Sequence, residues 1–284
     1  MIYALVTIYN PAKNVINNIK AISKQVDKVF LCDNSYISHE EMFSEIKNIN
    51  FFFFKENLGL SAAFNKVLQQ DERFNDEDFV IFFDQDSQIV DNHVNQLIQD
   101  YRMLENEGIE IGCLGPVYFN INSNILEIPR KKEHIKNQVY SVSNIITSSM
   151  LCRYGRIREI GFWNEDIFLD MADWDLCWRL QEKRWKCCLD LKIVLNHSLG
   201  EGEKKVFFLK LEVSNPVRGY YQIREALYLI RKKYTPLKYK IRFIYMLSIR
   251  PILHLIFFDK KNERLKYFFK GIKGFVYGER GAYM

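Results

Sequence analysis

At residues 79–87 the sequence reads FVIFFDQDS, in which five apolar residues lead directly into two carboxylates, Asp84 and Asp86. An uninterrupted apolar run rich in β-branched and aromatic residues is typical of a strand buried on both faces. Because alternate residues of an extended chain point the same way, the two carboxylates can converge just beyond the strand end. Such a pair favours a divalent cation that also holds phosphate oxygens, and a solvated acidic turn is the alternative.

Further apolar runs flank this strand along the chain, and helical patterns separate most of them. Strands are predicted at residues 2–8, 28–32, 51–54, 111–117 and 187–195. Strands that alternate with helices predict an α/β fold with a mostly parallel sheet, right-handed crossovers and helices on both faces. The polar segment 120–140 lacks periodicity and is predicted to be an irregular, mobile excursion. Ligands of such sheets collect outside the carboxyl ends of the strands, where Asp84 and Asp86 are expected.

The charge of the chain is unevenly distributed. Residues 204–284 carry 19 Lys and Arg against 5 Asp and Glu, whereas residues 1–203 carry 21 against 30. Helices predicted at 220–233 and 237–258 are apolar on one side and basic on the other, and the apolar part of the second is too short and too polar to span a bilayer. An interfacial segment on an anionic membrane is therefore expected, and packing on the body or on a second subunit is the alternative.

The cysteines and the N-terminus bear on the cellular compartment. The six cysteines contain no C-x-x-C pair and lie in apolar surroundings, so we expect reduced core residues and neither a disulfide framework nor a zinc site. They are Cys32, Cys113, Cys152, Cys177, Cys187 and Cys188. The first residues lack the basic segment of a signal peptide and are predicted to form a strand. Cytosolic residence is the expectation.

Six short motifs follow one another along the chain. They are Thr7-x-Tyr9-Asn10-Pro11, Asp33-Asn34-Ser35, Asn57-x-Gly59-x-x-x-Ala63-x-Asn65, Asp84-Gln85-Asp86-Ser87, Asp173-Trp174-Asp175-x-x-x-Arg179 and His197. This ordered set resembles family 2 glycosyltransferases with the GT-A fold, and most of all the bacterial rhamnosyltransferases of O-antigen and capsule assembly. The resemblance covers nearly the whole chain. It implies a Rossmann-like GT-A catalytic domain at 1–203 and a basic amphipathic helical extension at 204–284.

The resemblance also implies roles for individual residues. The nucleotide of the donor would be bound by Thr7, Tyr9, Asn10, Asp33, Asn57, Gly59, Asn65 and Asp84. A Mg²⁺ or Mn²⁺ ion would be bound by Asp86 with Asp84 and His197, although His197 is as readily a structural residue. Asp173 would be the general base, with a helix cap or a surface carboxylate as the alternative. Acceptor contacts or support would come from Asp170, Trp174, Asp175 and Arg179.

The implied reaction is the inverting transfer of L-rhamnose from dTDP-rhamnose to a hydroxyl of a lipid-linked oligosaccharide, at the cytoplasmic face of the membrane. Glycine is common in the family at Ser35 and Ser149, and its absence leaves the donor or the acceptor open. An acidic residue is common at Ala172, so the usual pair is reduced to the one carboxylate of Asp173. A UDP-hexose donor for a galactosyl-, glucosyl- or N-acetylglucosaminyltransferase is the alternative. A nucleotidylyltransferase would carry a glycine-rich basic loop after the first strand, which residues 9–14 lack.

A non-catalytic membrane-binding protein is the remoter alternative, suggested by the basic C-terminal quarter. Nucleic acid is not expected as a partner, since the chain shows no recognised module and its first 203 residues carry a net negative charge that would repel phosphates. A homodimer contact through the C-terminal helices remains open.

Overall fold

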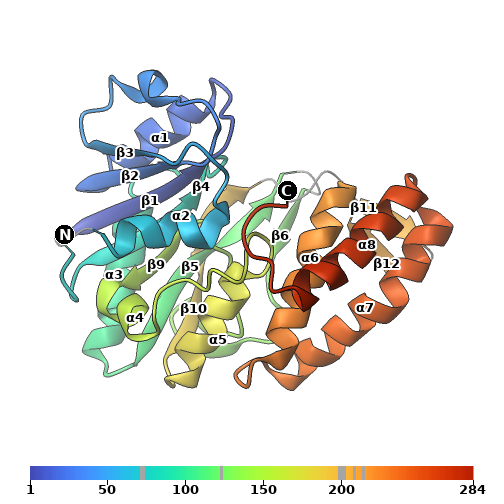
Figure 1. The fold of residues 1–284 in the computed structure, drawn as a ribbon. Helices are drawn as coiled ribbons and strands as arrows, with labels where there is room; N and C mark the ends of the chain where they lie inside the picture. The colour runs from blue at the N-terminus through green and yellow to red at the C-terminus, as the bar shows by residue number, and fades with distance from the viewer. Residues whose placement is uncertain (71–73, 122–123, 198–202, 207–208, 213–214, 284) are drawn as a thin grey trace.

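The computed structural model describes residues 1–70, 74–121, 124–197, 203–206, 209–212 and 215–283 (Figure 1). Parallel strands form the N-terminal part of its main sheet, in the order β3-β2-β1-β4. They are β1 (Ile2–Ile8), β2 (Lys28–Asp33), β3 (Ile49–Phe53) and β4 (Phe79–Asp84). The connections contain α1 (Val15–Ser23), a short 3₁₀ turn at Glu40–Phe43 and α2 (Gly59–Leu68). The predicted alternation of parallel strands and helices is confirmed.

The second part of the sheet mixes directions. After α3 (His93–Asn106), β5 (Ile111–Asn120) runs parallel to the long β10 (Lys186–His197), and β9 (Met150–Arg153) joins β4 to β5 in antiparallel pairing. Figure 1 shows this mixed sheet with a mostly parallel core as one continuous layer. Beyond β9, α4 (Tyr154–Glu159) and α5 (Ala172–Glu182) lead into β10.

The prediction of an irregular excursion at residues 120–140 was wrong. This region contains β6 (Ile125–Glu127), β7 (Glu133–Lys136) and the first half of β8 (Val139–Val142). β6 pairs with the end of β5, and β8 pairs with β10 and with β7. β6 and β7 are short and largely exposed at the border of the sheet, and β8 buries only Val139 and Val142 between β10 and β7. Pairing with neighbouring strands specifies these elements, because each is too short to show an apolar alternation.

The uninterrupted apolar run of β4 reflects burial on both faces of the sheet. Val80 and Phe82 belong to the core cluster that α2 and α5 cover, whereas Phe79, Ile81 and Phe83 belong to the cluster that α1 and α3 cover. All five side chains are almost completely buried. Burial of one such side chain stabilises the fold by about 1.5–3 kcal/mol, so this strand anchors both layers and fixes the position of the acidic turn behind it.

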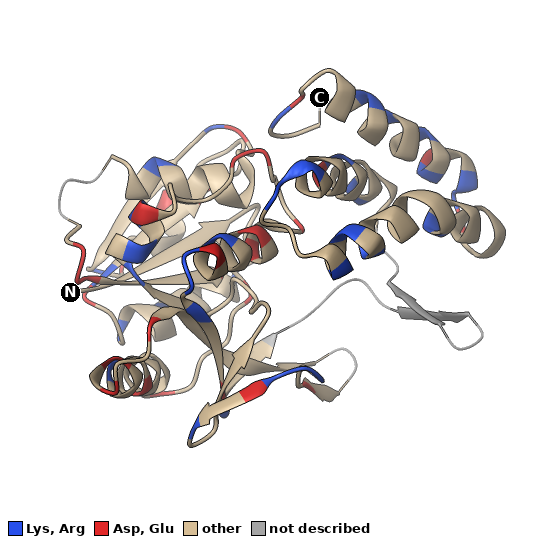
Figure 2. Ribbon diagram, turned by 90° about the horizontal axis from the view of Figure 1, so that it is seen from below, with Lys and Arg blue, Asp and Glu red and all other residues tan. Residues whose placement is uncertain are grey.

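The C-terminal region is helical and packs on the body of the molecule. It consists of a hairpin of β11 (Glu203–Val206) and β12 (Leu209–Glu212), followed by α6 (Pro216–Arg231), α7 (Leu237–Phe257) and α8 (Lys261–Val276). The predicted helical extension at 204–284 contains α8, but the sequence analysis gave this helix no bounds of its own. Figure 2 shows Lys and Arg spread along these helices. Within the described part of the chain, no helix combines the length and apolar character that crossing a bilayer requires.

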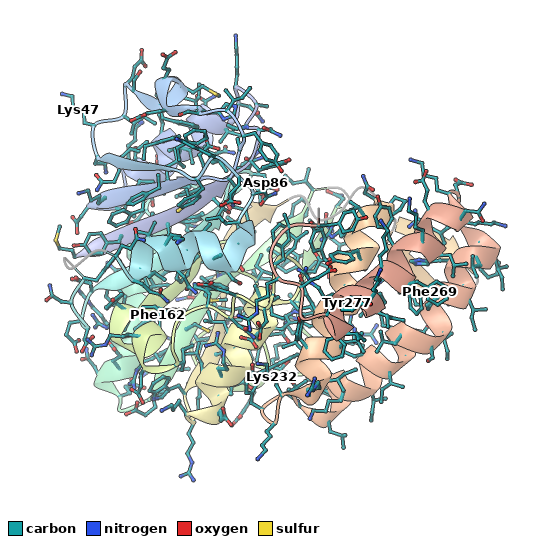
Figure 3. All side chains as sticks on the ribbon, in the orientation of Figure 1. Lys47, Asp86, Phe162, Lys232, Phe269 and Tyr277 are labelled. Atoms are coloured by element: carbon teal, nitrogen blue, oxygen red, sulfur yellow. The ribbon has the colours of Figure 1, made fainter. Side chains whose placement is uncertain are left out.

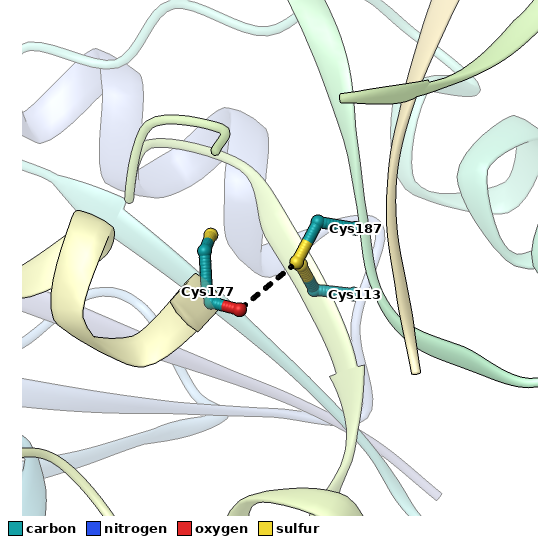
Figure 4. A group of neighbouring side chains, drawn as sticks. All are labelled: Cys113, Cys177 and Cys187. Carbon is teal, nitrogen blue, oxygen red and sulfur yellow. Dashed lines mark hydrogen bonds between the residues drawn. The ribbon is translucent and has the colours of Figure 1, made fainter. Parts of the chain in front are cut away.

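The cysteines are all buried and unpaired, which confirms the expectation of reduced core residues. Three of them, Cys113, Cys177 and Cys187, place their sulfur atoms within 4.8 Å of one another (Figure 4). The Cys187 thiol donates to the carbonyl oxygen of Cys177 at 3.5 Å. Burial raises the pKa of the Cys113 and Cys177 thiols well above the usual range, so these thiols are protonated and act as small apolar core residues.

Candidate active site

The carboxyl ends of three adjacent strands are aligned at one edge of the sheet. In the parallel pairing of β1 with its neighbours, Thr7 lies opposite Asp84 of β4, and Ile8 lies opposite Asp33 of β2. Figure 3 shows Asp86 at this edge, just beyond β4. The topology therefore brings together the predicted residues Thr7, Asp33, Asp84 and Asp86, as the strand pattern indicated.

The loop after β1 is held by its neighbours. The backbone N–H of Tyr9 donates to Gln85 Oε1 at 2.8 Å, and that of Asn10 donates to Ser35 Oγ at 2.8 Å. Asn10 takes a left-handed conformation with φ 45°, which asparagine tolerates. Tyr9 and Asn10 are left exposed at the site edge, where a nucleotide could contact them.

Asp33 is fully buried at the end of β2. Its Oδ1 accepts from the backbone N–H of Ser35 at 2.9 Å, and its Oδ2 accepts from the backbone N–H of His39 at 3.0 Å. The His39 ring nitrogen Nδ1 lies 3.1 Å from the same oxygen. Asp33 thus shapes the loop at residues 34–39. Its predicted contact with the donor nucleotide would have to use the lone pairs of its carboxylate oxygens that these hydrogen bonds leave free. The sequence analysis missed His39, which belongs to no motif.

The acidic turn after β4 is fixed by hydroxyl groups. Asp84 Oδ2 accepts from Ser148 Oγ at 2.5 Å, and Ser87 Oγ donates to the Ser148 hydroxyl at 3.2 Å. Asp84 and Asp86 are both partly exposed, so their carboxylates can reach a ligand. An isolated bridge between Gln88 and Asn196 brings the end of β10 beside this turn. The side chain of His197, the predicted third metal ligand, lies outside what the structure describes.

Asp173 lies in the first turn of α5. Its Oδ1 accepts from the backbone N–H of Trp174 at 2.8 Å, which orients the carboxylate. Burial, and after it the negative charges of Asp84 and Asp170, raise the pKa of Asp173 from 3.8 to about 7, although the Trp174 N–H acts in the opposite direction. Asp173 is therefore close enough to Asp84 for their charges to interact. The predicted base and the predicted metal-binding turn share one site.

Comparison with known proteins agrees with this geometry. Residues 3–157 match the sequence model described as Glycosyl transferase family 2. The chain belongs to this family. One curated relative of the glycosyltransferase is the dTDP-rhamnosyl transferase RfbF of Shigella flexneri, with 28% identity over 303 residues that cover 99% of this chain and 96% of the relative.

Solved structures show the GT-A fold. A crystal structure of GalNAc-T7 with UDP, GalNAc and Mn²⁺ matches with a TM-score of 0.59 at 15% identity, over 98% of this chain and 56% of the other. S. aureus TarS matches with a TM-score of 0.53 at 14% identity, over 97% of this chain and 48% of the other. The glycosyltransferase thus spans about half the length of each of these chains.

The start of α2 in the glycosyltransferase is shaped by a close approach of two backbones. Gly59 has φ +78°, and a Cβ added to it would lie 2.5 Å from the carbonyl oxygen of Phe168. The Asn57 side chain accepts from the Gly59 N–H at 3.0 Å, and the Asn34 amide donates to the Gly59 carbonyl at 3.1 Å. The close approach of the segment that precedes Asp173 therefore requires a glycine at position 59. This requirement is independent of the predicted contact of Gly59 with a nucleotide.

Asn65 of α2 is bonded within the protein. Its amide nitrogen donates to the carbonyl oxygen of Trp163 at 2.9 Å and to Glu165 Oε1 at 2.8 Å, and its amide oxygen accepts from the Trp163 N–H at 3.0 Å. The side chain is almost completely buried. The structure therefore gives Asn65 the role of holding the turn at 163–165, and its predicted nucleotide contact stays a prediction.

A buried carboxylate on α6 organises the segment that leads to Asp173. Glu225 Oε1 accepts from the backbone N–H groups of Phe168 and Leu169 at 2.9 and 3.1 Å, and Oε2 accepts from that of Asp170 at 3.2 Å. Burial, and then the charge of Asp170, raise the pKa of Glu225 to about 8. Arg218, also on α6, forms an ion pair with Asp170 at 2.6 Å. The sequence analysis missed both α6 residues, since no local pattern marks them.

Asp175 and Arg179 form a buried structural pair. Arg179 Nε donates to Asp175 Oδ2 at 2.7 Å, and the two side chains form an ion pair within α5. Asp175 Oδ1 accepts from Asn164 at 3.0 Å and from the Tyr234 hydroxyl at 2.6 Å. Because Asp175 is fully buried, its contribution is to tie α5 to the segment before α7.

The tryptophans divide between core and surface. Trp163 and Trp178 are each 2% exposed, too little to stack on an acceptor sugar. Trp174 is partly exposed and packs against Tyr239 and Phe243 of α7, with ring centroids 5.2 and 6.3 Å apart. It is the tryptophan of α5 that remains available to an acceptor, and it also anchors α7 on the body.

The backbone explains one departure from the family pattern. Ser149, where glycine is common, has φ +66°, and its N–H donates to the carbonyl oxygen of Phe82 at 2.6 Å. Its hydroxyl lies 2.7 Å from Nε2 of the buried His93. Glycine adopts this conformation without strain, whereas the serine here compensates with a hydrogen bond through its side chain.

The donor set of the site fits a hard divalent cation. Asp84 and Asp86 offer carboxylate oxygens at one edge, and oxygen ligands are what Mg²⁺ and Mn²⁺ prefer. The charges of Asp84 and Asp170 destabilise the ionised form of Asp173, and a cation at the acidic turn would relieve this repulsion. GT-A enzymes typically use a divalent metal, and the GalNAc-T7 structure contains Mn²⁺.

Proposed function

We propose that this family 2 glycosyltransferase transfers L-rhamnose from dTDP-rhamnose to a hydroxyl of a lipid-linked oligosaccharide in surface polysaccharide assembly, with inversion at the anomeric carbon. The observation that supports it most is the alignment of Thr7, Asp33 and Asp84 at the carboxyl ends of adjacent strands, where the charge of Asp84 also raises the pKa of Asp173. The full-length similarity to a dTDP-rhamnosyl transferase supports rhamnose as the sugar.

In this mechanism Asp173 accepts the proton of the acceptor hydroxyl. The acceptor oxygen forms a bond to the anomeric carbon while the bond from that carbon to the diphosphate oxygen breaks, and the nucleoside diphosphate departs from the opposite face. A pKa of about 7 suits a general base near neutral pH, because the carboxylate is substantially ionised and still basic enough to take a proton.

The remaining side chains bind and orient. Asp84 and Asp86 would hold a Mg²⁺ or Mn²⁺ ion, which when bound offsets negative charge on the leaving diphosphate. Thr7, Tyr9 and Asn10 line the edge where the nucleotide would lie. Arg218 and Glu225 position the segment that carries Asp173 into the site.

We further propose that the enzyme is peripheral on the cytoplasmic face of an anionic membrane, and that α7 makes the contact. The outward face of this helix carries a row of aliphatic side chains that are 46–73% exposed: Leu237, Ile241, Ile244, Ile249, Ile252 and Ile256. Lys238 and Arg242 are exposed beside its first half, where they can attract acidic head groups. A second copy of the chain is the other surface that could cover this row.

Donor binding and hydrolysis across a panel of nucleotide sugars test the proposal. The panel contains dTDP-rhamnose, UDP-galactose, UDP-glucose and UDP-N-acetylglucosamine, each with and without Mn²⁺ or Mg²⁺. We expect selective, metal-dependent use of dTDP-rhamnose. Preference for a UDP-sugar would keep the mechanism and replace the donor, whereas a folded enzyme that uses none of the four would overturn the proposal.

A further inference from the structure

A groove between the three C-terminal helices combines apolar walls with positive charge. The space inside it is narrow, about 40 Å³, and opens to solvent. Its walls include Ile223 of α6, Met246 and Leu255 of α7, and Leu265 and Phe268 of α8. Arg250, His254 and Arg264 also line it, and none of the described residues that line it is acidic.

The polar groups of the groove are arranged to favour an anion. Arg250 donates to Gln222 Oε1 at 2.8 Å and to His254 Nε2 at 3.3 Å, which holds its guanidinium in place. Arg264 donates through Nε to the carbonyl oxygen of Asp259 at 2.9 Å. Burial, and then the positive charges of Arg250 and Arg264, lower the pKa of His254 to about 4, so the imidazole is neutral and the positive charge that lines the groove is that of the two guanidinium groups. Asp259 and Glu263 act on Arg264 from outside the groove lining.

The groove borders the exposed face of α7. Pro251 and Leu255 line the groove, and their neighbours Ile252 and Ile256 belong to the outward aliphatic row. A hydrocarbon chain that leaves the groove therefore meets apolar side chains along its path. Guanidinium groups beside a hydrocarbon path match an amphiphile that carries phosphate on a long apolar chain.

The same helix connects the groove to the catalytic segment. On α6, Gly219, Gln222 and Ile223 line the groove, whereas Arg218 and Glu225 bind the segment at residues 168–170. The groove and the catalytic segment thus lie on different sides of one helix, whose diameter with side chains is about 10–12 Å. A lipid phosphate held in the groove would keep its attached saccharide near Asp173.

We propose that this groove binds the phosphate-bearing prenyl lipid of the acceptor. The inference rests on the proposed function, since it assigns a place to the lipid part of a lipid-linked acceptor. The ligand is a phosphate or diphosphate ester of a long isoprenoid alcohol. Arg250 and Arg264 in the groove would bind the anion, and the chain would leave the groove along the exposed aliphatic row of α7.

The structure offers a substitution that fills the groove without disturbing the fold. Gly219 lies within α6, and a Cβ added there would meet nothing within 4 Å. Gly219→Leu would place a side chain in the groove while improving helix propensity. Gly219→Ala is the matched control, because it has the same benefit to the helix and leaves the groove largely open. For the charge, Arg264→Gln is compared with Lys266→Gln, an exposed position on the same helix.

Binding of farnesyl diphosphate to the full chain, measured by calorimetry in EDTA, tests the proposal apart from catalysis. The EDTA prevents metal-dependent binding of the diphosphate at the acidic turn. We expect saturable binding of farnesyl diphosphate and much weaker binding of farnesol or inorganic diphosphate alone. Gly219→Leu and Arg264→Gln should each weaken binding at least tenfold, whereas Gly219→Ala and Lys266→Gln should stay within about twofold of the unchanged chain.

Transfer kinetics separate this inference from the proposed function. Gly219→Leu should raise KM for a lipid-linked acceptor at least tenfold and leave transfer to a lipid-free saccharide and flotation with phosphatidylglycerol vesicles unchanged. Equal binding of farnesyl diphosphate by Gly219→Leu and by Gly219→Ala would overturn the groove assignment even if transfer occurs. Loss of vesicle flotation in Gly219→Leu would also overturn it, since the groove would then serve general membrane lipids. If the enzyme uses none of the four donors but shows this pattern of farnesyl diphosphate binding, only the proposed reaction is refuted.

Discussion

Substitution of Asp173 by asparagine separates its catalytic cost from its structural cost. Asparagine keeps the shape of the side chain and an oxygen that can accept from the Trp174 N–H, so the start of α5 should stay in place. It cannot accept a proton from the acceptor. General base catalysis contributes about 10²- to 10⁴-fold, so kcat should fall by that factor, equivalent to about 2.7–5.4 kcal/mol.

The effect on stability should have the opposite sign. The pKa of Asp173 is raised from 3.8 to about 7 in the folded protein, so folding favours the protonated carboxyl. The associated stability is present at low pH and is lost as pH rises through about 7, where the ionised group is destabilising. The full shift corresponds to an upper bound of about 4 kcal/mol. Asp173→Asn should therefore be stabilising at pH 8 and nearly neutral at pH 4.

The assay pairs transfer kinetics with thermal unfolding at pH 4, 6 and 8. Asp91→Asn is the control, since Asp91 is an exposed carboxylate in the loop before α3. It should change neither kcat nor the unfolding temperature. In the unchanged enzyme with Mg²⁺ present, kcat should rise with pH over a range below about 7, because a bound cation favours the ionised form of Asp173. Near-normal kcat in Asp173→Asn, or destabilisation at pH 8, would refute the reasoning.

Three further substitutions test the surrounding structure. Glu225→Gln presents an amide NH₂ to the Asp170 N–H, so it should cost about 1–3 kcal/mol in unfolding free energy and raise the acceptor KM, measured by denaturant titration and kinetics. Gly59→Ala forces a side chain into a left-handed position and a close contact, and should lower the unfolding free energy by about 1–3 kcal/mol. Ile249→Glu should abolish flotation with anionic vesicles. The control Asn262→Glu, at an exposed position on α8, should leave flotation unchanged. If Ile249→Glu still floats with vesicles but dissociates a dimer, the α7 face contacts a second subunit.

The sequence predicted those parts of the fold and site that rest on local patterns. The apolar run before Asp84 is readable because β4 is buried on both faces, and the acidic turn follows directly from the strand end. The start of α5 near Asp173 was readable from its acidic first turn. Parallel topology then places the strand ends together, so the order of strands and helices along the chain is enough to group Thr7, Asp33 and Asp84 at one edge.

The remainder depends on contacts between distant segments. Glu225 lies 55–57 residues from the three N–H groups that it accepts from, and Ser148 lies 64 residues from Asp84. No local spacing indicates such pairs. The segment at 120–140 was misread because its strands are specified by pairing with β5 and β10. For α8 a signal was present, since Leu265, Phe268 and Ile272 recur at helical spacing.

The anomeric configuration of the product tests the central claim most directly. Transfer from dTDP-rhamnose to the acceptor in the presence of Mg²⁺ or Mn²⁺, followed by NMR of the new glycosidic linkage, reports whether the configuration of the donor is inverted. The account predicts inversion in a single displacement, with Asp173→Asn at least a hundredfold slower. A retained configuration would contradict the assignment of Asp173 as the base of a direct displacement.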